Sequence, residues 1–350
     1  MASHGLSRRP VAARLSHLLT QRPPQCRIAA TFLVLGSVLL LLCAAFSRRW
    51  PFYPKRQSAT LTDGIFTFHL DLDVYKSLFP HLQHHQCQEV ISEDALCRGH
   101  SRTRLLLLAI NSHPASSDRR AALRRTWARP REVGGFTLRP VFLMATTANV
   151  KHARLVRLES AVFGDVLMWG FVESLHNRSL KQRCLLQWLQ GRCRHAAYVF
   201  KGDDNLFVNL KALTGYLSIL PRVPRFIHGN VRFHAAVVRE GEYGVSRTLY
   251  PMQCYPDFAS GGALVVPGPS IPALYRASLR LPVFPLDDVD LGFLALAARL
   301  PHQHNGRFRV WRPGEDELAV YQEALSVHGA SAERVEHVWW QLWGLSGGTA

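Results

Sequence analysis

The sequence predicts an α/β fold, a mixed sheet flanked by helices, and three observations support it. Apolar runs of strand length alternate with helix-like segments between residues 104 and 209. The 350 residues are 47% hydrophobic, so the chain can bury a sizeable core. The one apolar run too long for a strand lies near the N-terminus, outside this pattern. We therefore expect an N-terminal leader followed by one large α/β unit.

The alternating region fixes the order of the expected elements. Its first apolar run, Arg104 to Ile110, has the length of a buried strand, and Asp118 is expected to cap the helix that follows. Strands are predicted at 104–110, 140–144, 162–169, 198–200 and 206–208, and helices at 118–127, 150–160 and 180–189.

The N-terminal leader predicts a membrane anchor. Residues 28–46 carry no charge over 19 positions, which is close to the ~20 residues that a spanning helix needs. A cleaved signal peptide is the alternative, but basic Arg48 and Arg49 follow the run directly. We predict a cytosolic tail (1–27), a signal-anchor (28–46), a stem (47–86) and a lumenal domain (87–350), in a type II orientation.

The charge is concentrated in the leader. The chain has 42 Lys+Arg and 25 Asp+Glu, hence +17, but residues 1–62 hold nine basic residues and no acid. The remaining excess of +8 suits an anionic ligand and does not require nucleic acid. Neither zinc-finger spacing nor an RNA-binding signature is present, so no nucleic-acid partner is expected.

Seven cysteines and one glycosylation sequon describe the part after the leader. Cys87–Cys97 and Cys184–Cys193 are expected as local disulfides in an oxidising lumen, although spacing alone does not fix connectivity. Asn177 is the acceptor of the sequon Asn-Arg-Ser and is expected to carry a glycan. The histidines of 81–85 are interpreted as a solvated turn rather than a metal site.

An acidic break between two apolar runs is the strongest candidate site. Asp203, Asp204 and Asn205 follow the strand that begins at Tyr198 and precede the run at 206–208. Buried carboxylates at a strand end are costly unless a cation meets them, and α/β sheets bind ligands at such ends. A solvated turn is the alternative, because Asp and Asn favour turns.

Three further patterns could belong to the same site. Arg120 and Arg124 share one helix face and suit a diphosphate or carboxylate, although a solvated basic face is the alternative. Gly261 and Gly262 enter an apolar strand, where they permit either close approach of a ligand or a tight turn. The run 287–290 holds three carboxylates, which offer either a general base or an ordinary helix N-terminus.

Together, these motifs resemble the Golgi β-1,3-glycosyltransferases of glycosyltransferase family 31. The resemblance rests on five motifs in order, and it extends over roughly 78–345. The motifs are Arg120-Ala-Ala-Leu-Arg124-Arg-Thr-Trp127, Phe163-Gly-Asp165-Val, Lys201-Gly-Asp203-Asp204-Asn205, Tyr255-Pro with Ser260-Gly-Gly262, and Asp287-Asp288-Val. Within that family, Asn177-Arg-Ser-Leu-Lys181-Gln and Glu323-Ala-Leu-Ser-Val-His328-Gly are most similar to the β-1,3-N-acetylglucosaminyltransferases.

The resemblance implies a fold of the GT-A type and an inverting transfer of N-acetylglucosamine from UDP-GlcNAc. The acceptor would be the 3-hydroxyl of a terminal β-galactose on a glycoprotein or glycolipid, and Mn²⁺ or Mg²⁺ would assist departure of UDP. It also implies Golgi residence, with homo- or hetero-oligomerisation left open. The implied roles are Asp288 as general base; Arg120, Arg124, Asp203, Asp204, Gly261 and Gly262 at the donor; and Asp204, Asn205 and His304 at the metal.

The chain departs from the family pattern at three places. Asn205 stands where the family has a third aspartate, which costs the metal site one negative charge. Asn111 stands where the subfamily usually has a lysine, and Glu315-Asp-Glu-Leu318 replaces a late cysteine-containing motif. The alternatives are therefore a β-1,3-galactosyltransferase, or a weakly active or non-catalytic partner of another glycosyltransferase. A salt-sensitive binding protein for acidic glycans is the third, least favoured, alternative.

Overall fold

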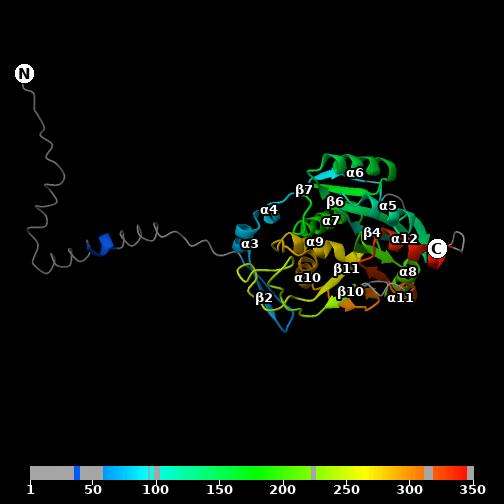
Figure 1. Cartoon of the computed structure of the whole chain (residues 1–350). Helices are drawn as coiled ribbons and strands as arrows, with labels where there is room; N and C mark the ends of the chain where they lie inside the picture. Colours follow the sequence, from blue (N-terminus) through cyan, green and yellow to red (C-terminus); the bar gives the residue numbers. More distant parts are fainter. Residues whose placement is uncertain are drawn as a thin grey trace, which may run out of the picture. The chain divides into compact units, whose positions relative to one another are not determined.

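The computed structural model describes residues 35–39, 58–93, 95–97, 103–221, 226–310 and 318–344 (Figure 1). The chain divides into one unit at 1–56 and a second at 57–350. In the first unit only the helical residues 35–39 are described, so nearly all of the predicted tail and anchor lie outside the described residues. Among the residues that are described, no helix is both long enough and apolar enough to cross a bilayer.

A mixed sheet forms the centre of the second unit, as the sequence predicts. Strands β8, β4, β6 and β7 run parallel, whereas β11 and β3 join the two sides of this group antiparallel. The sheet order is β12 (His302–His304), β10 (Ile227–Arg232), β11 (Phe258–Pro267), β8 (Tyr198–Asp203), β4 (Arg104–Asn111), β6 (Phe136–Thr146), β7 (Val166–Val172) and β3 (Glu89–Ile91), and β5 (Arg131–Val133) pairs with β6.

Helices cover both faces of this sheet, because successive side chains of each strand point to opposite sides. In β4, Leu106 and Leu108 belong to one core and Leu105 and Leu107 to the other. The first core also takes in α5 (Ser117–Arg125), α6 (Val150–Phe163), α8 (Leu210–Ser218), α11 (Leu318–Glu323) and α12 (Ala332–Trp343). The second takes in α7 (Arg178–Arg192), α9 (Ile271–Ser278) and α10 (Asp287–Ala297), which lie together in Figure 1.

A small three-stranded sheet lies beside the main one. It joins β13 (Phe308–Arg309), β14 (Ser326–His328) and β9 (Leu206–Val208), in that order. Strand β9 is the second apolar run of the acidic stretch, so this sheet brings the late part of the chain to Asp203–Asn205. A short 3-10 helix (Gly268–Ser270) follows β11 and leads into α9.

The folded unit begins about thirty residues earlier than the sequence predicts. Residues 58–83, assigned to the stem, form β1 (Ser58–Thr62), β2 (Thr67–Asp71), α3 (Leu72–Leu78) and α4 (Pro80–Gln83). Phe68 and Tyr75 are completely buried in a third core with Phe284 and Phe293. The polar appearance of this segment arises because only alternate residues of the hairpin face that core.

Several predicted boundaries shift for identifiable reasons. Ser116, not Asp118, precedes α5, and Asp118 lies in the first helical turn. Strand β7 begins at Val166 because α6 continues to Phe163 and ends at Gly164, whose φ of 60° is left-handed. The segment 302–304, for which no strand is predicted, pairs in parallel with β10 as an edge strand.

The disulfides join partners that are distant in sequence, so both predicted local pairs are wrong. Cys87 bonds to Cys184 and Cys97 to Cys193. Cys184 lies within α7 and Cys193 at its end, nine residues apart, which corresponds to about 13 Å along a helix. A disulfide needs Cα atoms about 4.4–6.8 Å apart, so these two cysteines cannot pair with each other. Cys254 is a free thiol.

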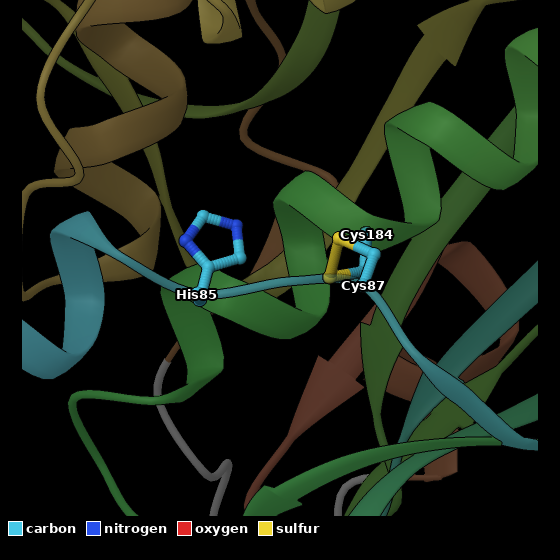
Figure 2. A group of neighbouring side chains, drawn as sticks. All are labelled: His85, Cys87 and Cys184. Carbon is cyan, nitrogen blue, oxygen red and sulfur yellow. A yellow bond between two sulfur atoms is a disulfide. The ribbon is translucent and has the colours of Figure 1, made fainter.

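The segment preceding β3 places a histidine beside one disulfide (Figure 2). His85, Cys87 and Cys184 are the one trio of His, Cys or acidic side chains in the described part of the chain close enough to share a metal. Both sulfur atoms are bonded to each other in the disulfide, whereas metal binding requires free thiolates. His85 instead hydrogen-bonds through Nδ1 to the Leu82 carbonyl at 2.7 Å, so the trio is structural.

Candidate functional site

A polar cavity of about 440 Å³ opens where β4 and β8 end. These strands are parallel neighbours, and their last residues, Asn111 and Asp203, lie opposite each other in register. This edge is where α/β sheets bind ligands. The lining is Asn111, Ser112, His113, Ser116, Arg119, Glu173, Ser174, Leu175, Arg178, Lys181, Asp203, Asp204, Asn205 and Glu242.

The two aspartates of the acidic stretch face this cavity with separate sets of partners. Asn111 donates from Nδ2 to Asp203 Oδ1 at 3.2 Å, and Arg178 lies 3.8 Å from Asp203 Oδ2. The Ser112 hydroxyl donates to Asp204 at 2.8 Å, and Arg119 approaches it at 3.2 Å. The bend between β8 and β9 is therefore a fixed polar corner rather than a solvated turn.

Two side chains that can bind a divalent cation, those of Asp203 and His328, lie together at Gly262. A Cβ at Gly262 would lie 2.9 Å from Asp203 Oδ2 and 3.1 Å from His328 Cδ2, so these side chains are neighbours. The φ of +69° at Gly262 also favours glycine, which lies with Gly261 in β11. Asn205 Oδ1 is buried and has no hydrogen-bond partner among the described residues. Carboxylate and carbonyl oxygens suit Mn²⁺ and Mg²⁺, so the Asp203 and Asn205 oxygens fit the expected metal.

His304, the histidine predicted as a metal ligand, lies away from the acidic stretch at Asp203–Asn205. His304 lies on β12, and three strand spacings, about 14 Å, separate β12 from β8. Its Nδ1 accepts a hydrogen bond from the Val231 amide at 3.1 Å. His328 takes its place beside Asp203, because β14 pairs with β9 and sets His328 opposite Leu206. The signal for His328 was present in the sequence as the late His-Gly motif, but the resemblance implied a role at the metal for His304.

A lysine on β8 connects the polar corner at Asp203 to the carboxylates of Asp287 and Asp288. Lys201 precedes Asp203 by two residues on β8, and its Nζ lies 2.7 Å from Asp287 Oδ2 and 3.9 Å from Asp288 Oδ1. Asp287 and Asp288 form the first turn of α10. Burial, and then the neighbouring Asp287, raise the pKa of Asp288 to about 7. Burial opposes ionisation of Asp287 as well, but Lys201 holds the pKa of Asp287 below its usual value.

Asp288 therefore has the properties of a general base. A base is most effective when its pKa lies near the working pH, and a pKa of about 7 meets this condition. Its side chain remains 29% exposed, so a reacting hydroxyl can reach it.

Arg120 and Arg124 share a helix face as predicted, but they point into the protein rather than toward a donor. Arg120 is completely buried and forms two hydrogen bonds to Glu159, at 2.7 and 2.8 Å. Arg124 bonds to both oxygens of Asp165 at 2.8 Å and also to Glu159. The two predicted donor contacts are thus corrected, because these carboxylates already neutralise and enclose both guanidinium groups.

Arg120 supports the cavity indirectly. Its Nη1 donates to the Ser112 hydroxyl at 3.0 Å and to the His113 carbonyl at 2.6 Å. Ser112 in turn donates to Asp204, so a buried charge fixes the loop from which the cavity wall is made.

Three other cations line the cavity. Arg119 precedes Arg120 on α5, and its side chain is 40% exposed, as is that of Arg178. Lys181 is buried, and its Nζ pairs with Glu173 at 2.7 Å. Sequence reasoning selected the helix face with the regular i, i+4 spacing and so missed Arg119. Lys181 appeared only within the subfamily motif.

The predicted glycosylation acceptor is inaccessible in the folded chain. Asn177 is 8% exposed, and its Nδ2, the atom that would carry a glycan, donates to the Val172 carbonyl at 2.7 Å. Ser179 of the same sequon is completely buried. The sequon instead forms the start of α7, which positions Arg178 and Lys181, so the structure argues against a glycan there.

Comparisons with known proteins agree with this geometry. Residues 118–306, more than half of the chain, match the family described as "Galactosyltransferase". The human "Acetylgalactosaminyl-O-glycosyl-glycoprotein beta-1,3-N-acetylglucosaminyltransferase" is 36% identical over 67% of this chain, which spans 65% of that relative's length.

Two further relatives carry similar names. The bovine "UDP-GlcNAc:betaGal beta-1,3-N-acetylglucosaminyltransferase 9" is 33% identical over 76% of this chain and 70% of its own length. The human "N-acetyllactosaminide beta-1,3-N-acetylglucosaminyltransferase 4" is 29% identical over 94% of this chain and 92% of its own length. The resemblance found in the motifs is confirmed: the chain belongs to the galactosyltransferase family, among relatives named as β-1,3-N-acetylglucosaminyltransferases.

Proposed function

We propose that this protein is an inverting glycosyltransferase of the GT-A type that moves N-acetylglucosamine from UDP-GlcNAc to the 3-hydroxyl of a terminal β-galactose. One observation carries the proposal. Lys201 lies on the strand that leads to Asp203 and Asp204, and it pairs with the helix turn that carries Asp288. The proposed donor site and the proposed general base therefore lie on two sides of one site. The names of the relatives supply the donor and linkage.

The cavity supplies the donor side of this reaction. Arg119, Arg178 and Lys181 are cationic groups that can contact a diphosphate, but four carboxylates of the lining outnumber them, so a bound divalent cation would have to supply further positive charge. Asp203, Asn205 and His328 would hold Mn²⁺ or Mg²⁺, which when bound neutralises charge on the departing UDP. The Asn205 side chain contributes a carbonyl oxygen instead of a carboxylate, so we expect weaker metal affinity than a third aspartate would give.

Asp288 supplies the acceptor side. Its carboxylate would take the proton from the galactose 3-hydroxyl as that oxygen attacks the anomeric carbon of the donor. The new glycosidic bond forms as the bond to UDP breaks, which inverts the anomeric configuration. General-base help of this kind typically contributes about 100–10,000-fold. Lys201 keeps Asp287 ionised and fixes the orientation of the helix turn that carries Asp288.

Two alternatives remain within the same family. A galactosyl donor is the first, since the matched family is named for galactosyl transfer. Reduced activity or a non-catalytic role beside another glycosyltransferase is the second, and Asn205 motivates it. We further propose that the chain resides in the Golgi membrane as a single-pass type II protein with the folded unit in the lumen. Protection of the folded unit from protease in intact Golgi vesicles would support that placement.

The donor and linkage can be tested together. We would incubate the full-length purified chain with Mn²⁺, a β-galactoside, and equal concentrations of UDP-GlcNAc and UDP-galactose, and determine the product by NMR. The proposal predicts a β-1,3-linked N-acetylglucosamine. A galactosyl product would establish the first alternative. Absence of any product from the wild-type chain, with activity appearing on Asn205→Asp, would favour the second.

A further inference from the structure

The helix turn that carries the proposed base has no capping side chain of its own. Helix α10 begins at Asp287, and the residue at its N-cap, Leu286, has no side-chain atom that could accept a hydrogen bond from the first turn. The connection between α9 and α10, residues 279–286, contains neither helix nor strand. The position of Asp288 therefore depends on the contacts that other segments make with this connection and with the first turn.

Arg183, on α7, makes the most extensive of these contacts. Its side chain is 4% exposed, and all five of its N–H donors have acceptors. Two of the bonds go to the two carboxylate oxygens of Asp290, at 2.6 and 2.9 Å, and Asp290 Oδ1 also accepts the Phe284 amide at 2.9 Å. The other three bonds go to the backbone carbonyls of Ser278, Leu281 and Pro282. One buried side chain thus joins the end of α9, the connection and the first turn of α10.

This arrangement fixes geometry more than it adds stability. A buried ion pair is often no more stabilising than an apolar pair of similar volume, because both charges lose their hydration. A guanidinium that binds both oxygens of one carboxylate nevertheless has a defined plane and direction. Gln182, next to Arg183, adds a bond from Nε2 to the Asp287 carbonyl at 3.0 Å. Because Asp290 follows Asp288 by two residues in the same turn, a shift of these contacts would move the base.

A further contact comes from the segment that the sequence assigns to the stem. Gln83, the last residue of α4, donates from Nε2 to the Val283 carbonyl at 2.9 Å, and its Oε1 accepts the Val283 amide at 2.8 Å. Leu82, beside Gln83, packs against Val283 in a small core of its own. The connection before α10 is therefore bonded both to α7 and to a segment 200 residues earlier in the chain.

We propose that Arg183 and Gln83 are positioning residues for the transfer reaction, which hold Asp288, through the connection 279–286, where an acceptor hydroxyl can reach it. The inference rests on the proposed function, because it takes Asp288 as the general base. Neither Arg183 nor Gln83 lines the donor cavity, so both act on the base and not on nucleotide binding. Residues 58–83 consequently contribute to catalysis through Gln83.

The test measures kcat per UDP-binding site in the full-length chain, with UDP-GlcNAc, Mn²⁺ and a β-galactoside. Counting sites by UDP titration removes misfolded protein from the comparison. Arg183→Lys keeps a cation beside Asp290, but an ammonium has three donors and no planar fork, so it cannot make all five bonds. We expect kcat to fall at least about tenfold with UDP affinity within about twofold of wild type, since a misplacement of about 1 Å can cost about a hundredfold.

Gln83→Ala provides a second, milder variant that removes two hydrogen bonds from a half-buried side chain and leaves the core intact. We expect about a threefold to fivefold loss of kcat per UDP-binding site, with unchanged UDP affinity. Wild-type kcat in both Arg183→Lys and Gln83→Ala would overturn the proposal. A loss of UDP affinity in parallel with kcat would also overturn it, because a general loss of structure affects both.

Arg104→Lys is the matched control. Arg104 also donates to a backbone carbonyl, that of Leu217 at 3.1 Å, but it begins β4 at the end opposite to Asn111, which lines the donor cavity. Both kcat and UDP affinity should equal those of wild type in this variant.

Hydrogen exchange separates this inference from the proposed function, because it does not depend on turnover. We expect amide exchange in residues 281–290 to rise in Arg183→Lys and Gln83→Ala, while exchange in β4 stays as in wild type. No rise in residues 281–290, or a rise spread over the whole folded unit, would refute a positioning role. A wild-type chain that transfers no sugar, with variants that exchange faster only in this segment, would contradict the proposed function and leave the positioning of Asp288 supported.

Discussion

The Nζ atom of Lys201 lies 2.7 Å from Oδ2 of Asp287, and this ion pair joins the strand of the donor corner to the helix of the proposed base. Lys201 and Asp203 lie on the same face of β8 because they are two residues apart. The buried Lys201 ammonium therefore stands among Asp203, Asp287 and Asp288. Its removal would leave Asp287 without its nearest cation, since Arg178 and Lys181 act on this carboxylate less strongly than Lys201 does.

Replacement of Lys201 tests this relationship. Lys201→Met keeps the bulk of the side chain but removes the nearest cation of Asp287, and breaking a buried pair typically costs about 3–5 kcal/mol. We expect a lower melting temperature and at least a tenfold loss of transfer (about 1.4 kcal/mol at the transition state). Lys211→Met, on the exposed side of α8, is the control and is expected to leave both quantities unchanged. Equal behaviour of the two variants would show that the ion pair is dispensable.

The pH dependence of activity follows from Asp288. Its pKa is raised to about 7, and it can accept a proton only when it is ionised. The value of kcat/KM should therefore fall about tenfold per pH unit below 7 and level off above it. The profile is measured with saturating metal between pH 5 and 9. A profile that is flat across pH 6–8 would show that another group, or no titrating base, limits the reaction.

Two adjacent arginines on α5 should behave in opposite ways. Arg120→Met removes one of the two arginine partners of the buried Glu159 and is expected to destabilise the fold by about 3–5 kcal/mol. Arg119→Met removes a partly exposed cavity cation and should weaken UDP binding severalfold while the melting temperature stays within a few degrees. Thermal denaturation and UDP titration separate the two effects. If the Arg120→Met protein were stable and bound UDP more weakly, Arg120 would be a residue that contacts the UDP-sugar donor, as first predicted.

The disulfides give a covalent prediction. Peptide mapping without reduction should recover Cys87 linked to Cys184 and Cys97 linked to Cys193. Each bond closes a loop of about a hundred residues, for which chain entropy predicts roughly 4–5 kcal/mol of stabilisation. Cys87→Ser with Cys184→Ser should therefore lower stability substantially, whereas Cys254→Ser should not. Recovery of a Cys87–Cys97 peptide would contradict the fold around α7.

The sequence predicted the elements that local chemistry controls. The runs 104–110 and 198–200 became central strands because nearly continuous apolar residues are needed where both sheet faces are covered. The polar corner at Asp203 was located for the same reason, since a carboxylate at the end of a buried strand needs partners. Ordered motifs, more than any single residue, identified the family.

What the sequence did not predict depends on contacts between distant segments. Arg120 shows the regular spacing of a ligand-binding face, but Glu159, 39 residues away, turns it into a core residue. His328 reaches the site through β14, which pairs with β9 more than a hundred residues earlier in the chain. Residues 58–83 looked like a stem because the aromatic core that buries Phe68 comes largely from residues 245–293. Spacing in one segment carries no information about these partners.

Transfer by Asp288→Asn tests the central claim most directly. Asparagine keeps the size of the side chain but cannot accept the acceptor proton, while the donor cavity is untouched. With UDP-GlcNAc, Mn²⁺ and a β-galactoside, we predict at least a hundredfold loss of kcat with UDP affinity retained, and no change in Asp118→Asn, on the exposed first turn of α5. An Asp288→Asn variant that turns over at the wild-type rate would contradict the assignment of this site.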